Sequence, residues 1–199
     1  VAFSADGKKV ASVGGDRTVR VLDPTTGAAL LAVSPFKGNI FAVAFHPDNE
    51  HLLVAGADPN AAKLLAVADG SERQTFEGHG GPVTCLALSR DGKQLAVGNE
   101  PRRGPDKPSV VVWDVTTGKE RCRRDHGWEI CGLAFSPDGK TLATADYFSV
   151  DLWDALAGKR VAKLDEDGRA VSFDASGERL VTGGALCVSC HRSAHPQPA

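Results

Sequence analysis

Leu133-Ala-Phe-Ser-Pro-Asp-Gly139 is the stretch that decides the fold, because closely similar stretches occur four more times along the 199 residues. Each copy starts with Val or Leu, has Phe or Leu as its third residue and ends with Gly or Asn. The other copies are Val1-Ala-Phe-Ser-Ala-Asp-Gly7, Val43-Ala-Phe-His-Pro-Asp-Asn49, Leu86-Ala-Leu-Ser-Arg-Asp-Gly92 and Val171-Ser-Phe-Asp-Ala-Ser-Gly177. The third residues of successive copies are 42, 43, 47 and 38 positions apart. This spacing predicts that the chain repeats one structural unit of about 40 to 45 residues.

The residues inside one period predict antiparallel hairpins. In the fourth copy, short apolar runs alternate with polar residues, and an Asp-Gly pair at 138–139 marks a tight turn. The expected strands of this copy are Cys131–Ser136, Thr141–Ala145, Val150–Asp154 and Arg160–Leu164. Four antiparallel strands with this period are typical of a β-propeller blade. We therefore predict an all-β chain of about four full blades and part of a fifth, forming a partial or open propeller.

The repeat limits follow from the same spacing. We expect blades at about residues 1–40, 41–83, 84–130 and 131–169, a partial blade at 170–184, and an irregular tail at 185–199. The sequence opens inside the first copy and contains no Met, and propellers close with about four to eight blades. We therefore expect a fragment of a longer protein, whose end blades would expose apolar flanks.

A second phrase closes the third expected strand in three of the copies, and it has decayed to Leu65-Ala66 in the second copy. It is clearest in Val110-Val-Val-Trp-Asp-Val-Thr-Thr-Gly118 and Val150-Asp-Leu-Trp-Asp-Ala-Leu-Ala-Gly158, and it survives as Leu22-Asp23 in the first copy. A Gly78-His79 pair precedes the third copy. On these residues the chain resembles the WD-repeat (WD40-type) family, as a bacterial member, over about residues 1 to 184. The resemblance implies a propeller that holds protein partners.

The resemblance also implies a hydrogen-bonded network that fixes each blade. In the family it joins a histidine before the first strand, a Ser or Thr in the second, an Asp in the next turn and the Trp of the third. The fourth copy offers His126, Thr144, Asp146 and Trp153, and the third offers His79 and Trp113 with Asp106. The set is similar to a Ser-His-Asp hydrolase triad, but a unique active site would not recur in several copies. We expect a structural network, no catalytic residues and no enzyme activity.

Two connections are candidates for partner binding. The segment 99–108 is enlarged, stiffened by proline, and carries Arg102, Arg103 and Lys107. Trp128 stands just before the first strand of the fourth copy. The resemblance places both connections on one face, and Trp beside Arg is typical of interface hot spots. The alternative is that the arginines are merely solvated and that Trp128 packs on a neighbouring blade.

The fifth copy loses the pattern after its second strand, where the phrase Cys187-x-x-Cys190-His191 follows. This spacing is used to attach c-type haem through two thioethers, with the histidine as axial ligand. A zinc site with His195 as fourth ligand is a further alternative. We favour the interpretation that, because of a boundary or a shifted reading frame, unrelated residues stand in place of the rest of the fifth blade.

Composition narrows the function classes. A formal net charge of −2 gives no overall attraction to nucleic acid or to anionic membranes, and no apolar stretch approaches the roughly 18 to 20 residues of a membrane helix. We predict a non-catalytic scaffold that binds a protein partner and needs no cofactor. The alternative is a propeller joined to a c-type haem module for electron transfer. The first would suit the cytoplasm, and the second a compartment outside it.

Overall fold

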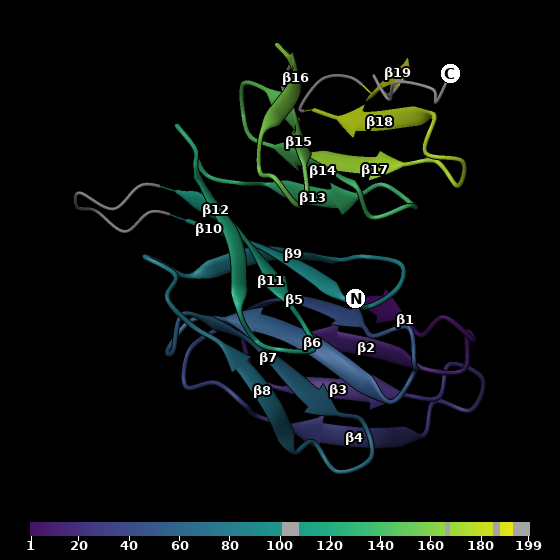
Figure 1. Cartoon of the computed structure of the whole chain (residues 1–199). Helices are drawn as coiled ribbons and strands as arrows, with labels where there is room; N and C mark the ends of the chain where they lie inside the picture. Colours follow the sequence, from purple (N-terminus) through teal and green to yellow (C-terminus); the bar gives the residue numbers. More distant parts are fainter. Residues whose placement is uncertain (101–107, 166–167, 185–187, 193–199) are drawn as a thin grey trace.

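A computed structural model describes residues 1–100, 108–165, 168–184 and 188–192. Strands are the only regular elements of these residues, and they form five antiparallel sheets (Figure 1). The first sheet contains β1 (Ala2–Phe3), β2 (Val10–Val13), β3 (Val19–Leu22) and β4 (Ala29–Val33). The second contains β5 (Ile40–Phe45), β6 (His51–Gly56), β7 (Ala61–Ala66) and β8 (Glu72–Phe76). The third contains β9 (Val83–Leu88), β10 (Gln94–Asn99), β11 (Ser109–Asp114) and β12 (Glu120–Asp125).

The fourth sheet confirms the strands expected from the sequence. Its strands β14 (Thr141–Ala145), β15 (Val150–Asp154) and β16 (Arg160–Leu164) have the expected limits. The first strand, β13 (Gly132–Phe135), is shorter than expected by one residue at each end. In every sheet the strands pair in sequence order. The predicted all-β architecture of four-stranded blades is therefore confirmed.

The fifth sheet corrects one expectation. It contains β17 (Ala170–Phe173), β18 (Arg179–Gly183) and β19 (Val188–Arg192). The irregular tail expected from residue 185 is therefore wrong for residues 188–192, which pair with β18 from Gly183↔Val188 to Arg179↔Arg192. The physical reason is that backbone pairing does not need the missing Trp-Asp phrase. A free edge of β18 would expose a row of N–H and C=O groups, and the returning chain satisfies them.

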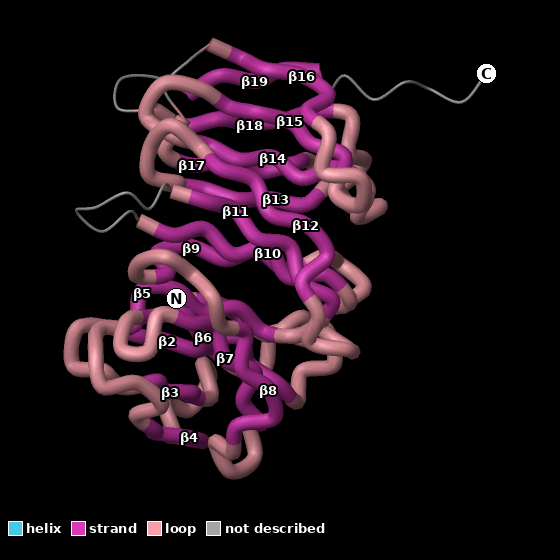
Figure 2. Tube along the Cα trace, turned by 60° about the vertical axis from the view of Figure 1, so that its left-hand side comes forward, coloured by secondary structure: helices cyan, strands magenta, loops and turns pink. Residues whose placement is uncertain are grey.

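The sheets follow one another in an open arc, which Figure 2 shows as successive layers. The first strand of each sheet contacts the first strand of the next, as β5 does with β9 and β9 with β13. The apolar core lies between neighbouring sheets. One cluster, for example, joins Leu53 and Ala55 of β6 to Leu95 and Val97 of β10 and to Trp113 of β11. Each blade is thus stabilised by the blades beside it, as in other repeat proteins.

The repeated phrase forms the same turn in three sheets. The hydroxyls of Ser4, Ser89 and Ser136 donate to the aspartate two residues later at 2.7, 2.6 and 2.6 Å. Each hydroxyl also accepts the amide five residues later at 2.9 Å. The glycine after the aspartate has a φ between 70° and 74°, a conformation that suits glycine. These contacts explain why the phrase recurs.

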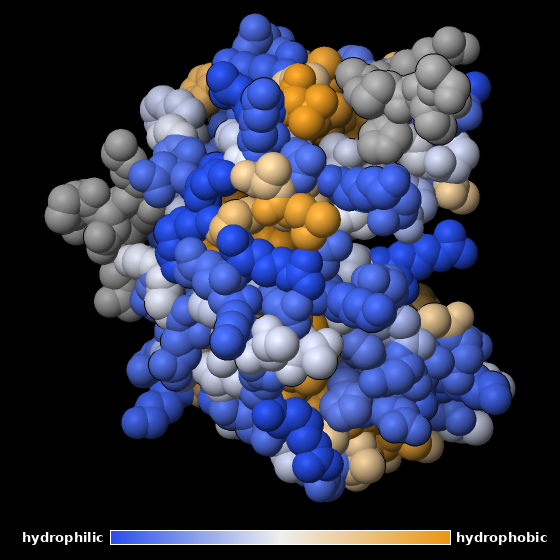
Figure 3. Space-filling view, viewed as in Figure 1, coloured by the Kyte–Doolittle hydropathy of each residue, from blue (hydrophilic) through white to orange (hydrophobic). Residues whose placement is uncertain are grey.

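The molecular surface is mixed in character. The face in Figure 3 is largely hydrophilic, with apolar atoms gathered in separate patches. Among the described residues, no helix is long and apolar enough to cross a membrane.

Candidate functional site

The connections of the blades alternate between two ends. In the fourth sheet, the β12–β13 connection (126–131) and the β14–β15 turn (146–149) lie at one end, which we call the loop face. The β13–β14 turn (136–140) and the β15–β16 turn (155–159) lie at the other end, which we call the turn face. Neighbouring turns contact each other across the turn face, since Gln94 Nε2 donates to the carbonyl of Gly139 at 2.9 Å. The two faces therefore extend over adjacent blades.

The loop face of the fourth blade carries exposed aromatic side chains. Trp128 is 55% exposed and lies against Phe148, which is 58% exposed, with ring centroids 4.7 Å apart. Tyr147 is also exposed, and the guanidinium of Arg169 lies 5.2 Å from its ring centroid. We call Trp128, Tyr147, Phe148 and Arg169 the aromatic patch. Side chains of this size normally pack inside a protein, so their gathering on one surface makes the aromatic patch a candidate contact site.

A tight turn holds two members of the aromatic patch. The carboxylate of Asp146 accepts the amides of Phe148 and Ser149, both at 2.8 Å. The backbone of this turn is therefore held by the Asp146 side chain, and it would lose little further conformational entropy on binding. Sequence reasoning missed Tyr147 and Phe148. The signal that could have found them is two adjacent aromatic residues in a turn of four residues.

The titratable groups around the aromatic patch include the Cys131 thiol and two acidic residues, Glu129 and Glu100. Burial raises the pKa of the Cys131 thiol, and the nearby Cys131 and Glu129 raise the pKa of the Tyr147 hydroxyl. Burial, assisted by the charge of Glu100, raises the pKa of Glu129. The patch thus combines an apolar surface with one cation, Arg169, and a small acidic border.

Of the four residues expected to bind a partner, the structure describes only Trp128. Trp128 lies on the loop face, half exposed, and packs against Phe148 of the β14–β15 turn. Arg102, Arg103 and Lys107 lie outside the described residues. Their flanking strands β10 and β11 end and begin at the loop face, where the carboxamide of Asn99 accepts the amide of Ser109 at 2.7 Å. Both connections named from the sequence therefore start from the same face.

The structure brings together three of the four expected network residues of the fourth blade. Trp153 Nε1 donates to the hydroxyl of Thr144 at 2.9 Å. The ring of His126 lies edge-on against Trp153, with centroids 5.5 Å apart, and burial lowers the pKa of this imidazole. Asp146 instead holds its own turn. Thr144 is only 1% exposed, so its hydroxyl is not accessible to a substrate, and the arrangement is that of a packing network.

The third blade has the same arrangement without its hydroxyl. The His79 ring lies edge-on against Trp113, with centroids 5.9 Å apart. Leu95 pairs with Trp113 as Leu142 pairs with Trp153, so Val97 occupies the place of Thr144. Trp113 Nε1 is buried and has no hydrogen-bond partner among the described residues. Asp106, the expected turn residue, lies outside the described part of the chain.

The last two residues of the Cys-x-x-Cys-His phrase lie on strand β19. Cys190 pairs with the exposed Val181 and His191 with the buried Leu180. Neighbouring residues of a strand point to opposite faces of the sheet, and Cys190 is exposed whereas His191 is half-buried. Cys187 and His195 lie outside the described residues. The strand separates two residues that a haem or zinc site would need on one side.

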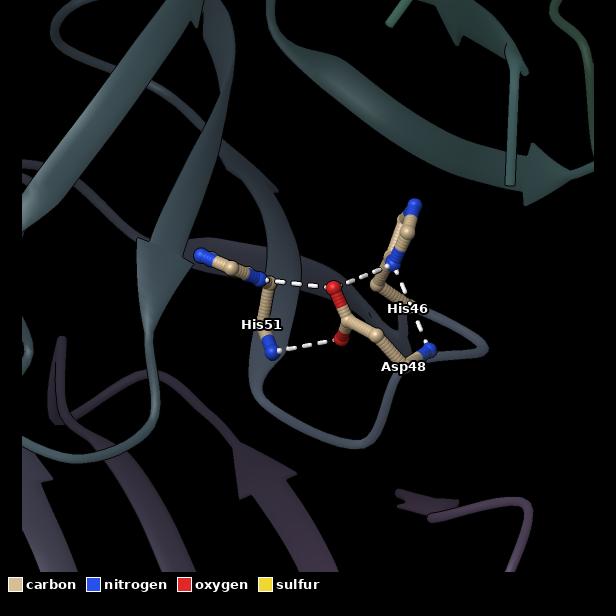
Figure 4. A group of neighbouring side chains, drawn as sticks. All are labelled: His46, Asp48 and His51. Atoms are coloured by element: carbon tan, nitrogen blue, oxygen red, sulfur yellow. Dashed lines mark hydrogen bonds and ion pairs between the residues drawn. The ribbon is translucent and has the colours of Figure 1, made fainter.

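A second group of side chains gathers on the turn face, and sequence reasoning missed it. His46 and Asp48 lie in the β5–β6 turn, His51 begins β6, and both imidazoles approach the carboxylate of Asp48 (Figure 4). His46 Nδ1 and His51 Nδ1 each lie 2.8 Å from Asp48 Oδ2. The sequence signal for this group was available: the second copy has two histidines around its aspartate, and the other copies have none at these positions.

Comparison with known proteins agrees with the fold. The family model described as WD domain, G-beta repeat, matches residues 1–23, 31–61, 70–114 and 119–154. Cilia- and flagella-associated protein 52 of Macaca fascicularis is 34% identical over 67% of this chain and 24% of its own length. Pre-mRNA-processing factor 19 homolog 2 of Arabidopsis thaliana is 28% identical over 90% of this chain and 34% of its own. The small ribosomal subunit protein RACK1y of Oryza sativa subsp. japonica is 34% identical over 51% and 29%.

The chain thus spans about a quarter to a third of the length of these relatives. All three come from eukaryotes, and they give no support to the bacterial origin expected from the sequence. The family model covers more than half of the chain and includes both Trp-Asp phrases. Together with the four-stranded sheets, this match shows that the chain belongs to the WD40 repeat family.

Proposed function

We propose that this chain is a non-catalytic scaffold module that binds a protein partner through the aromatic patch on its loop face. The observation that carries the proposal is the contact between Trp128 and Phe148, two rings that are each more than half exposed. Large aromatic side chains bury much area at low entropic cost and are enriched among the residues that dominate binding energy. Arg169 beside Tyr147 supplies a cation next to this apolar surface.

The segment that carries Arg102, Arg103 and Lys107, which the sequence predicts to bind a partner, belongs to the same proposal. Its flanking strands end at the loop face, and arginine next to exposed aromatic residues is typical of interface hot spots. The three cations would favour a partner with acidic side chains around an apolar centre. Binding that relies on them should weaken as salt concentration rises, because salt screens exposed charges.

No catalytic role is proposed for the fourth blade. The histidine, threonine and aspartate that are similar to a hydrolase triad are buried at 7%, 1% and 5% exposure. The names of the relatives refer to cilia and flagella, to pre-mRNA processing and to the small ribosomal subunit. These are three different settings, so no single partner is carried over to this chain.

The test is a capture experiment with three forms of the chain as bait in an extract of the source cells. The first is unchanged, the second carries Trp128→Ala and Phe148→Ala, and the third carries Leu156→Ala. Leu156 is 60% exposed on the turn face, so it controls for the loss of exposed apolar area. We expect a defined protein that the first and third baits retain and that the second retains at least about tenfold less. Equal retention by all three folded baits would contradict the proposal.

A further inference from the structure

The β5–β6 turn differs in sequence from the corresponding turns of the other blades. The serine that the first, third and fourth copies share is replaced by His46 in the second copy, and His51 stands where those three copies have Lys9, Gln94 and Thr141. The Ser–Asp hydrogen bond fixes the turn in the first, third and fourth blades. Two imidazoles are therefore not required to fold this turn, and their presence calls for a different explanation.

The carboxylate of Asp48 is held between the two imidazoles. Its Oδ1 accepts the amides of Glu50 and His51 at 2.8 and 3.0 Å, which leaves Oδ2 to the rings. Oδ2 is therefore the carboxylate atom that faces both imidazoles.

The hydrogen bonds of His46 assign its tautomer. Its Nε2 lies 3.3 Å from the carbonyl oxygen of Gly92 in the neighbouring blade, and a carbonyl only accepts, so Nε2 carries the proton. Its Nδ1 accepts the amide of Asp48 at 3.4 Å. A neutral His46 therefore presents a lone pair to Asp48 Oδ2 at 2.8 Å. Two facing lone pairs repel each other, and a positive charge between the rings would turn this repulsion into attraction.

We propose that His46 Nδ1, Asp48 Oδ2 and His51 Nδ1 bind a divalent transition-metal ion with the ligand preference of Zn²⁺, leaving one coordination position open. Two imidazoles and one carboxylate are a ligand set that zinc accepts. In a tetrahedral site with bonds of about 2.0–2.1 Å, ligand atoms lie about 3.3 Å apart. The present N–O separations of 2.8 Å need to widen by only about half an ångström, which side-chain rotation supplies.

The surroundings support this site. The Gly92 carbonyl orients His46 through its other ring nitrogen, as backbone carbonyls commonly do for metal-binding histidines. A Cβ at Gly92 would overlap the His46 ring, so the two turns pack closely. The side chains of His46, His51 and Asp48 are 22%, 28% and 36% exposed, so an ion can enter from solvent. A bound ion would also strengthen the contact between the second and third blades.

The experiment titrates the full chain with Co²⁺ and then displaces it with Zn²⁺. We expect one Co²⁺ per chain, with the intense visible absorption of a low-symmetry four-coordinate site, and stoichiometric displacement by Zn²⁺. His46→Ser and His51→Gln copy residues that other turns of this chain already use, so both variants should fold. Because loss of an outer partner alone typically weakens metal binding 10- to 100-fold, loss of either ligand should weaken it by more than about 100-fold.

Controls separate this site from the other possible ligands. Cys190→Ser and His191→Gln should leave the Co²⁺ spectrum unchanged. The thiol of Cys85 does not compete, since burial raises its pKa to about 12. Two results would overturn the proposal: unchanged Co²⁺ affinity in the folded His46→Ser and His51→Gln variants, or no bound Co²⁺ in the unchanged chain.

Discussion

At the scale of single residues, the third and fourth blades differ in whether the tryptophan indole of the third strand makes a hydrogen bond. Trp153 Nε1 donates to the Thr144 hydroxyl, whereas Trp113 Nε1 is buried opposite Val97 and has no hydrogen-bond partner among the described residues. A buried polar group without a partner costs about 1–3 kcal/mol. The two blades therefore form a matched pair: the fourth has a hydroxyl, on Thr144, to accept from its tryptophan, and the third has Val97 at the same position.

Exchanging these two side chains should move stability in opposite directions. We expect Thr144→Val to destabilise the chain by about 1–3 kcal/mol, because it leaves Trp153 Nε1 without its acceptor. Val97→Thr supplies an acceptor to Trp113 and should be neutral or stabilising, although an added hydroxyl in a core is normally costly. Urea unfolding of both variants measures this. Similar destabilisation by both would show that the hydroxyl does not pair with the indole.

His79 should make the stability of the chain depend on pH. Burial, followed by the charge of Arg123, lowers its pKa to about 4, against about 6.5 in an unfolded chain. The contribution of His79 to the free energy of unfolding is complete above pH 6.5 and decreases as the pH falls to 4. The reason is that, in this range, the imidazole binds a proton in the unfolded chain but not in the folded chain. The decrease approaches roughly 3 kcal/mol. Urea unfolding at several pH values should show a smaller decrease in a His79→Asn variant, and identical profiles would contradict this assignment.

At the scale of elements, the position of a strand in its sheet should set its stability. All residues of β10 and β14 are buried, whereas β12 and β16 are mostly exposed or half-buried. Outer strands also have one unpaired edge and open locally at lower cost. We expect hydrogen exchange to be slowest in β6, β10 and β14 and fastest in β4, β12 and β16. Equal protection across each sheet would mean that the blades open only as whole units.

The elements also show what the sequence could predict. Three strands of the fourth sheet have the expected limits because the Asp-Gly turn and the alternating pattern are local signals. Strand β19 was missed because it forms by pairing with the edge of β18, which no local residue pattern encodes. The aromatic patch was only half foreseen, since Trp128 stands out in the sequence but its contact with Phe148 depends on how two connections meet. The convergence of His46 and His51 on Asp48 likewise depends on side-chain geometry.

At the scale of the whole molecule, the open arc leaves apolar side chains exposed on its first and last sheets. Phe3 of β1 is 64% exposed, and Val188 of β19 is 76% exposed. In repeat proteins, end surfaces of this kind promote association unless they are covered. We expect this chain to self-associate as its concentration rises, with sedimentation velocity as the measurement. A single monomeric species up to about 100 μM would show that the exposed ends do not attract each other.

The two surfaces lie at opposite ends of the blades and should act independently. The aromatic patch lies on the loop face, and the His46 group lies on the turn face of another blade. Loss of one surface should therefore leave the other intact. Saturating Zn²⁺ should not change partner capture through Trp128, and a change would indicate coupling between the second and fourth blades.

The most direct test of the proposed function is photo-cross-linking in living source cells. A photoreactive phenylalanine analogue replaces Tyr147, inside the aromatic patch. The same analogue at Leu156 on the turn face is the comparison, because that side chain is also exposed. The account predicts a discrete cross-linked protein after illumination from position 147 and none from position 156. Adducts that are identical from both positions, or absent from both in a folded chain, would contradict the claim that the aromatic patch is where a partner binds.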